Sequence, residues 1–364
     1  MTCPVPEGGI PITRRSAYGH RGVTIRIHPD GAIRPVHANL GGPVRRIGIV
    51  VGAASLFITA SAGVSVGAPA LDPREPTTEP VAAHHPVFER PLIAVAHRGA
   101  SGHAPENTLA AIDVAHELGA VTVEVDVQLT ADGEPVIMHD TTLERTTDVE
   151  AVFPDRAPYR VSDFTMAEIR RLDAGGWYDP AFAGEPVPTL GEVLDRMAEH
   201  DLNLLLELKE PELYPGLERA VAEELFDRAE WFRRNPPWEP RRLVIQSFDW
   251  ESVRESQDIL RPVPHGLLGM VPEDRIDDYG WAAMINPNHR HIDADYVRRV
   301  QEAGMEIMPY TINDRATMDA VLGLGVDGFI TDYPEVGREA IDDLDDGDRF
   351  GAPAPPAPPV AAND

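Results

Sequence analysis

Short apolar runs alternate with helical stretches along residues 92–340, and this alternation constrains the fold more than any other feature of the chain. Eight runs are predicted to be strands, at residues 92–96, 121–127, 202–208, 242–246, 264–269, 283–286, 306–311 and 327–331. Helices are expected between most of them, at residues 108–118, 189–199, 213–231, 249–259, 293–303, 314–322 and 335–341. Eight strand units in about 250 residues are typical of an α/β protein of the (β/α)8 TIM barrel type, and a doubly wound open sheet is the alternative.

Three other segments do not follow this rhythm. Residues 141–188 contain neither a clear strand nor a long helix, so we expect a small insertion after the second strand unit. The proline-rich residues 71–91 are expected to form a linker before a barrel that occupies residues 92–340. Residues 342–364 are rich first in Asp and then in Pro and Ala, and we expect a disordered tail there.

Residues 1–70 differ from the rest of the chain in charge. They carry seven arginines and two acidic residues, a formal charge of +5, in a chain whose net charge is −28. Residues 47–70 are uncharged, follow Arg45-Arg46 and end in Ala68-Pro69-Ala70, an order typical of a secretory signal. We therefore expect an exported protein whose leader is removed near Ala70. An uncleaved membrane anchor is the alternative.

The acidic composition of the chain limits the kinds of molecule that it can bind. Non-specific binding to nucleic acids or anionic lipid surfaces needs an excess of Lys and Arg, which the rest of the chain lacks. The single cysteine, Cys3, lies in the expected leader, so no disulfide is predicted for the exported protein. Of the 32 basic residues only Lys209 is a lysine. Either this position needs a lysine that arginine cannot replace, or its single occurrence is chance.

Two predicted strands carry carboxylates on the face opposite their apolar residues. Between residues 121 and 128 valines alternate with polar residues, so Glu124 and Asp126 share one face. In a strand buried on both faces two such carboxylates repel unless a cation lies between them, whereas on a solvated strand water would suffice. The next strand repeats the pattern and adds Glu207 and Lys209. If the strands form a barrel, these groups predict an oxygen-ligand site for Mg²⁺ or Ca²⁺.

Two histidines are expected at the same face of the barrel. His97-Arg98 ends the first strand, and His139 follows an apolar run after the Asp132-Gly133 turn. Either histidine alone would more often be structural, but beside an acidic cluster the pair can supply a general acid and a general base. The summed charge of such a site is about +1, from three carboxylates, a divalent cation, Arg98 and Lys209. This charge suits a phosphodiester monoanion.

These motifs resemble those of the glycerophosphodiester phosphodiesterase family. The run HRG, PENT, ExD and HD, followed by ELK, QSF, YTIN and DGFITDYP, covers residues 92–340. The resemblance implies metal binding by Glu124, Asp126 and Glu207, acid/base catalysis by His97 and His139, and phosphoryl binding by Arg98 and Lys209. It also implies attack of the glycerol 2-hydroxyl on phosphorus, giving a cyclic phosphate that water opens, with an alcohol and sn-glycerol 3-phosphate as products. Tyr310 stands where many members have tryptophan, so the alcohol-side pocket is left open.

Two other functions are compatible with such a barrel. One is a phospholipase D-like hydrolase of lysolipids or sphingolipids, which the insertion at residues 141–188 and the absence of an obvious apolar docking stretch disfavour. The other is a non-catalytic phosphodiester-binding protein, which the complete set of two histidines and three carboxylates disfavours. The expected partner is a small glycerophosphodiester, with neither nucleic acid nor a stable membrane partner.

Overall fold

The computed structural model describes residues 24–27, 33–36 and 90–349 of the 364-residue chain. The chain divides into two compact units, Met1–Val87 and Phe88–Asp364. In the first unit β1 (Thr24–Ile27) and β2 (Ile33–Val36) form an antiparallel pair. The expected leader and linker lie largely outside the described residues, so both stay predictions.

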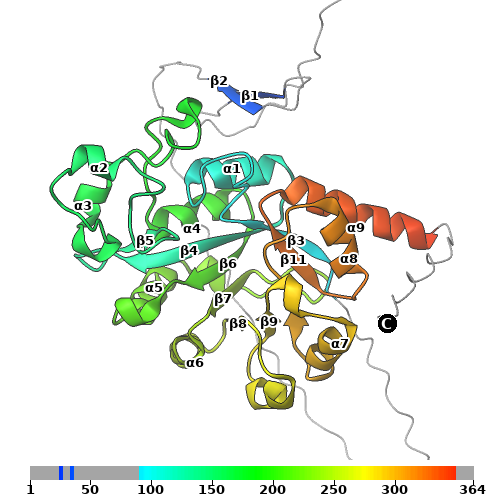
Figure 1. Ribbon diagram of the computed structural model, residues 1–364. Coiled ribbons are helices and arrows are strands. Elements are labelled where there is room, and N and C mark those ends of the chain that lie inside the picture. Colours follow the sequence, from blue (N-terminus) through cyan, green and yellow to red (C-terminus); the bar gives the residue numbers. More distant parts are fainter. Residues whose placement is uncertain (1–23, 28–32, 37–89, 350–364) are drawn as a thin grey trace, which may run out of the picture. The chain divides into compact units, whose positions relative to one another are not determined.

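A parallel barrel forms the second unit (Figure 1). Its strands are β3 (Ile93–His97), β4 (Thr122–Leu129), β6 (Asn203–Leu208), β7 (Leu243–Ser247), β8 (His265–Leu268), β9 (Met284–Asn286), β10 (Glu306–Ile307) and β11 (Gly328–Thr331). Their order in the sheet is β10-β9-β8-β7-β6-β4-β3-β11. Backbone amides of Asp327 and Ile330 donate to the carbonyls of Ile307 and Pro309, both at 3.0 Å, and so connect the two ends of the sheet. The predicted (β/α)8 barrel is confirmed, and the open-sheet alternative is wrong.

One predicted strand is shorter than expected. Residues 306–311 were predicted as a strand, but β10 covers only Glu306–Ile307. Pro309 lacks an amide hydrogen, and the amide of Met308 donates to the side chain of Asn286 at 3.2 Å, so the regular strand ladder ends there. The segment still follows the barrel wall, because Ile312 donates to the carbonyl of Ile330 at 2.9 Å.

Helices cover the outside of the barrel (Figure 1). They are α1 (Leu109–Glu117), α4 (Leu190–Glu199), α5 (Leu217–Phe226), α6 (Trp250–Ile259), α7 (Ala294–Glu302), α8 (Arg315–Leu322) and α9 (Pro334–Arg349). Between β8 and β9 the structure has the 3-10 helix Glu273–Tyr279. Side-chain caps start most of these helices directly after the loops at the carboxyl ends of the strands. Thr108, for example, accepts a hydrogen bond from the amide of Ala111, and Asp314 accepts one from Thr317.

Two helix predictions are corrected. The predicted helix 213–231 is shortened to α5, because Pro215 cannot continue a helix and Gly216 adopts a φ of +92° at the N-cap. The predicted tail begins later than residue 342, because α9 continues to Arg349. Asp342 pairs with Arg338 within α9, and Asp343 pairs with Arg315 of α8, which holds the added part of the helix against its neighbour. The rest of the predicted tail, residues 350–364, lies outside the described residues.

The insertion at residues 141–188 has its own small core. It contains α2 (Val149–Val152) and α3 (Met166–Ile169), and neither a long helix nor a regular strand, as predicted. It follows β5 (Pro135–Ile137), which pairs antiparallel with β4. The buried residues of this core include Val136 in β5, Met138 directly after it, Leu143 and Phe164. The insertion is therefore anchored to the strand that carries the predicted carboxylates.

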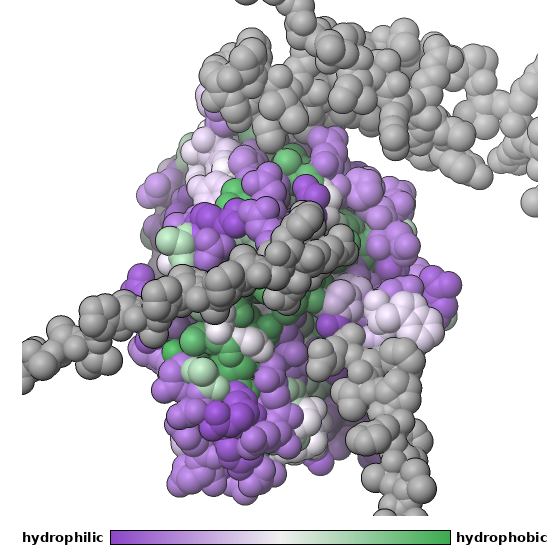
Figure 2. Space-filling view, turned by 90° about the vertical axis from the view of Figure 1, so that its right-hand side faces the viewer, coloured by the Kyte–Doolittle hydropathy of each residue, from purple (hydrophilic) through white to green (hydrophobic). Residues whose placement is uncertain are grey.

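The barrel interior changes from apolar to polar along the strands. Toward the amino ends of the strands the interior is filled by apolar side chains, those of Ile93, Val95, Leu205, Val244, Met284, Met308 and Ile330. The buried charged groups follow toward the carboxyl ends of the same strands. On the outside, the face in Figure 2 is mainly hydrophilic, with an apolar area in its middle. No helix in the described part of the chain is long and apolar enough to cross a membrane.

Candidate active site

Three carboxylates meet at the carboxyl ends of β4 and β6. Asp126 and Glu207 are register partners on these neighbouring parallel strands, and Glu124 lies two residues before Asp126. One oxygen from each of the three side chains lies within 4.8 Å of the others. The three residues are only 2%, 1% and 7% exposed, in chain order, so water does not separate their charges. The predicted convergence of these carboxylates is confirmed.

Two cationic side chains face this cluster. Lys209 Nζ lies 2.8 Å from Glu207 Oε1 and 3.7 Å from Asp126 Oδ1. Arg98 Nε lies 3.4 Å from Asp126 Oδ2, and the Arg98 amide donates to Glu124 Oε2 at 2.9 Å. Two cations do not balance three carboxylates, and Asp126 Oδ1 is buried without a hydrogen-bond donor. This donor set of hard oxygen atoms fits a divalent cation such as Mg²⁺ or Ca²⁺.

The pKa values of the three carboxyl groups in this cluster are shifted in different directions. Burial raises the pKa of Glu124 well above its usual value, and the charges of Asp126 and Glu207 raise it further. Burial and the charge of Asp126 raise the pKa of Glu207 to about 7. Burial opposes ionisation of Asp126 as well, but the charges of Arg98 and Lys209 outweigh it and keep the pKa of this carboxyl below its usual value. A divalent cation would favour the ionised form of all three groups.

Each predicted histidine is held by a carboxylate. His97 Nδ1 lies 2.6 Å from Asp332 Oδ1, and His139 Nδ1 lies 2.6 Å from Asp140 Oδ1. With Nδ1 engaged in this way, Nε2 is the nitrogen left to exchange a proton with a bound molecule. Burial lowers the pKa of His139, the Arg98 and Lys209 charges add to this, and the Asp126 charge opposes it. A neutral His139 can accept a proton near neutral pH.

A further layer of polar residues positions these groups. Asn107 Nδ2 donates to Asp126 Oδ2 at 2.8 Å, and Glu106 accepts from Arg98 at 2.8 Å. Arg145 pairs with both Glu106 and Asp140, at 2.7 and 2.6 Å, and so connects the two histidine-bearing loops. Glu106 and Asn107 thus fix the loop before α1, and Thr108 caps the helix.

Sequence reasoning gave no role to Asp332, Asp140 or Arg145. Asp332 directly follows β11, and Asp140 directly follows His139, so their places at strand ends were a usable signal for the first two. Arg145 gave no such signal, because it lies in the irregular insertion and reaches Glu106 across 39 residues.

One cavity of about 190 Å³ brings the predicted residues together. Six of the seven line it, and the seventh, Asp126, lies 1% exposed beneath them. The lining residues are His97, Arg98, Glu124, His139, Glu207, Lys209, Gln246, Phe248, Leu268, Tyr310, Thr311 and Ile330. Tyr310, noted above as a departure from the family pattern, packs edge-to-face on Phe248 with ring centroids 5.8 Å apart. The two rings form an apolar part of the cavity wall, and Lys209 Nζ lies 5.9 Å from the centroid of the Phe248 ring.

Comparison with known proteins decides the family. The model of the glycerophosphoryl diester phosphodiesterase family matches residues 97–336. The chain belongs to this family. A glycerophosphodiester phosphodiesterase from Caldanaerobacter subterraneus is 35% identical over 254 residues, which cover 67% of this chain and 95% of the relative. One from Bacillus subtilis is 32% identical over 260 residues, which cover 67% of this chain and 85% of the relative.

A solved structure agrees in fold as well as in sequence. A phosphodiesterase from Oleispira antarctica, determined with the product sn-glycerol-3-phosphate, aligns with a TM-score of 0.60 and 30% identity. The alignment covers 69% of this chain and 96% of that one. The chain is thus an enzyme of the glycerophosphodiester phosphodiesterase type, and the family resemblance predicted from its motifs is confirmed.

Proposed function

We propose that the chain hydrolyses glycerophosphodiesters to an alcohol and sn-glycerol 3-phosphate with one divalent cation, Ca²⁺ or Mg²⁺. Glu124, Asp126 and Glu207 would hold the cation, and His97 and His139 would act as general acid and base. One observation carries the proposal. Two carboxylates of a buried cluster of three line one cavity together with two histidines, each of which is held by a further carboxylate.

The residues of the cavity can perform each proton transfer of this reaction. Arg98 and Lys209 would bind the phosphoryl oxygens of the substrate. One histidine takes the proton of the glycerol 2-hydroxyl as that oxygen bonds to phosphorus, and the other protonates the departing alcohol oxygen as its bond to phosphorus breaks. Water then opens the cyclic phosphate with the two histidines in reversed roles. The bound cation would supply positive charge beside the phosphoryl oxygens.

Removal of the metal tests this proposal. We expect treatment with EDTA to abolish release of glycerol 3-phosphate from a deacylated phospholipid, and Ca²⁺ or Mg²⁺ to restore it. Glu124→Gln should stay inactive after metal is added, because it removes one ligand. Glu255→Gln removes an exposed carboxylate with no partner in the described part of the chain and serves as the matched control. Full activity in EDTA would exclude the metal role.

Turnover measured on a panel of substrates separates this function from the two alternatives, a phospholipase D-like hydrolase and a non-catalytic binding protein. We expect turnover of deacylated glycerophosphodiesters and little turnover of acylated lysolipids. Preferred turnover of lysolipids would favour the phospholipase D-like function, and tight binding without product would favour a non-catalytic binding protein.

We also propose that the protein is exported. The support is in the sequence, where residues 47–70 are uncharged and follow Arg45-Arg46. N-terminal sequencing of the protein secreted by cells that express the full chain should find a start near residue 71. Recovery only in the membrane fraction, with the leader retained, would favour the anchor instead.

A further inference from the structure

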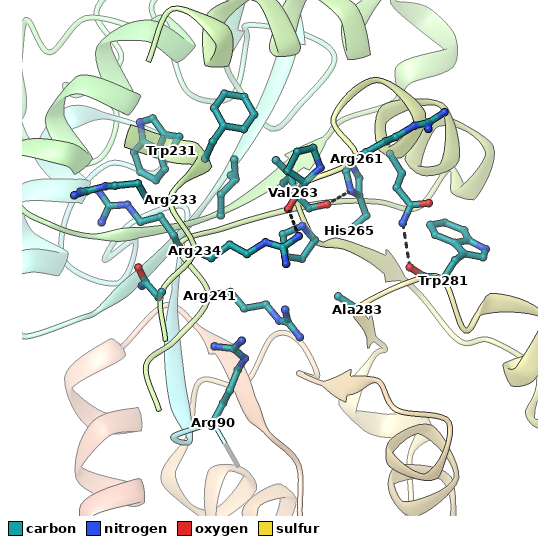
Figure 3. A pocket seen from close by; sticks show the side chains of 17 residues that line it. Arg90, Trp231, Arg233, Arg234, Arg241, Arg261, Val263, His265, Trp281 and Ala283 are labelled. Carbon is teal, nitrogen blue, oxygen red and sulfur yellow. Dashed lines mark hydrogen bonds between the residues drawn. The ribbon is translucent and has the colours of Figure 1, made fainter. Parts of the chain in front are cut away.

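A second cavity lies at the opposite end of the barrel from the candidate active site. It has a volume of about 280 Å³ (Figure 3). Arg90 precedes β3, Arg241 and Arg242 precede β7, and His265 begins β8, so the cavity opens at the amino ends of the strands. Catalytic groups of TIM barrels gather at the carboxyl ends, so this cavity has no part in the reaction proposed above.

The cavity is lined by arginines in an otherwise acidic protein. Its lining contains no Asp or Glu, although the chain carries a net charge of −28. The six arginines are Arg90, Arg233, Arg234, Arg241, Arg242 and Arg261. In Figure 3 the side chains of Arg90 and Arg241 extend toward each other. Burial and the nearby charge of Arg241 lower the pKa of Arg90, as expected for like charges held together.

Carboxylates balance only part of this charge. Glu306 is shared by Arg90 and Arg241, at 3.1 and 2.8 Å, and Asp201 pairs with Arg242 at 3.0 Å. Arg234 donates to the Pro262 carbonyl at 3.2 Å. Within the described residues the side chains of Arg233 and Arg261 have neither a hydrogen bond nor an ion pair. Of the six arginines that line the cavity, only three pair with a carboxylate of the described chain, and they share two carboxylates.

Two buried donors in the cavity wall lack acceptors. Trp231 Nε1 and Arg242 Nε are buried without a hydrogen-bond partner in the described part of the chain. The two residues are only 1% and 7% exposed. The Arg242 guanidinium lies over the Trp231 ring, 4.6 Å from its centroid, which fixes both side chains. The stacked pair holds the Arg242 guanidinium in place at the cavity wall.

We infer that this cavity binds a small polyanion that carries two phosphate groups. Guanidinium groups present paired donors that match phosphate oxygens, and Arg is favoured over Lys where such forked contacts form. The excess of about four positive charges suits a ligand of several negative charges. The volume is at the lower end of the range for small-molecule sites, which excludes a large ligand.

Titration calorimetry of the full chain with inorganic pyrophosphate, without added metal, tests this inference. We expect binding by the wild type and at least tenfold weaker binding by Arg233→Ala/Arg261→Ala. These two side chains have no partners to lose, so thermal unfolding should be unchanged. Inorganic phosphate should bind more weakly than pyrophosphate, and equal affinity would contradict the requirement for two phosphate groups.

Two controls separate this site from general charge effects and from the candidate active site. Arg160→Ala/Arg219→Ala removes the same charge from exposed arginines that line neither cavity, and it should bind pyrophosphate like the wild type. Lys209→Ala changes the candidate active site and should also retain binding. The inference is overturned if the wild type does not bind, if the control variant loses as much affinity as Arg233→Ala/Arg261→Ala, or if only Lys209→Ala loses it.

Discussion

The chemistry of the candidate site depends on carboxylates that touch the histidines as well as on the histidines themselves. Asp332 accepts from His97 and is itself held by Asn313, whose Nδ2 donates to Asp332 Oδ2 at 2.6 Å. Burial opposes ionisation of Asp332, but its hydrogen bond to His97 and the His97 charge outweigh this and keep its pKa below the usual value. Asp332 is therefore ionised at neutral pH and orients the His97 ring.

Asp332→Asn tests this positioning role. The amide cannot stabilise a protonated His97, so we expect kcat to fall by about 10²-fold with a much smaller change in KM. The pH profile of kcat should change as well, because the variant removes a carboxylate charge 2.6 Å from the ring of His97. Asp258→Asn, an exposed aspartate without a partner in the described residues, should leave both constants unchanged. An equal fall in kcat for both variants would contradict the role of Asp332.

Residue types and spacing were enough to predict that these seven residues meet, because each lies within or directly after an apolar run of the sequence. They could not predict how these residues are held. His97 and Asp332 are 235 residues apart and meet because the barrel closes β11 against β3. Such contacts depend on strand order, which the local pattern of a sequence does not contain.

At the scale of elements, one buried histidine connects a strand to its covering helix. His265 in β8 is fully buried, with Nε2 2.9 Å from Ser256 Oγ of α6 and Nδ1 2.9 Å from the Val263 carbonyl. Burial lowers the pKa of His265 from 6.5 to about 4. The neutral ring is thus part of the native structure.

This shift makes stability depend on pH. Unfolded chains bind the proton of this histidine at higher pH than the folded protein does, so its contribution is complete above pH 6.5 and declines as the pH falls toward 4. The shift corresponds to a loss of about 3 kcal/mol in the free energy of unfolding. Urea unfolding of the wild type and of His265→Gln should show a steeper decline for the wild type over this range. Parallel pH curves would contradict the prediction.

A capping box fixes the start of α4 and connects it to the insertion. The Thr189 side chain accepts from the Glu192 amide at 3.2 Å, and the Glu192 carboxylate accepts from the Thr189 amide at 2.9 Å. Glu192 also pairs with Arg170, which directly follows α3. We expect Thr189→Ala to reduce the free energy of unfolding by about 1 kcal/mol. Thr189→Ser keeps the hydroxyl and should stay within a few tenths of a kcal/mol of the wild type in the same urea titration.

The local sequence pattern predicted which helices and strands form better than it predicted where they end. The eight barrel strands occur where expected, because parallel strands buried on both faces produce short apolar runs. The ends of α5 and α9 were missed for opposite reasons. Pro215 and Gly216 outweigh a helical pattern, whereas ion pairs of Asp342 and Asp343 extend a helix into a segment whose composition suggests disorder.

For the whole molecule, the carboxylate cluster connects stability to metal and to pH. Without a cation the three buried carboxylates repel, and burial with this repulsion raises the pKa of Glu207 to about 7. A cation that binds only the folded protein at 100 times its Kd would add about 2.7 kcal/mol to the free energy of unfolding. We therefore expect Tm to rise when Ca²⁺ or Mg²⁺ is added to the EDTA-treated protein.

The same cluster predicts how metal affinity varies with pH. Below pH 7 the metal must displace the proton held by Glu207, and so Kd for the cation should rise about tenfold for each pH unit between 7 and 5. Calorimetric titration with Ca²⁺ at several pH values measures this slope and the protons released. Glu207→Gln should bind weakly at all pH values and show a shallower slope, because Glu124, whose pKa is also raised, still has a proton to lose, whereas Glu255→Gln should retain the full slope. An affinity that is independent of pH in the wild type would mean that these carboxylates do not hold the cation.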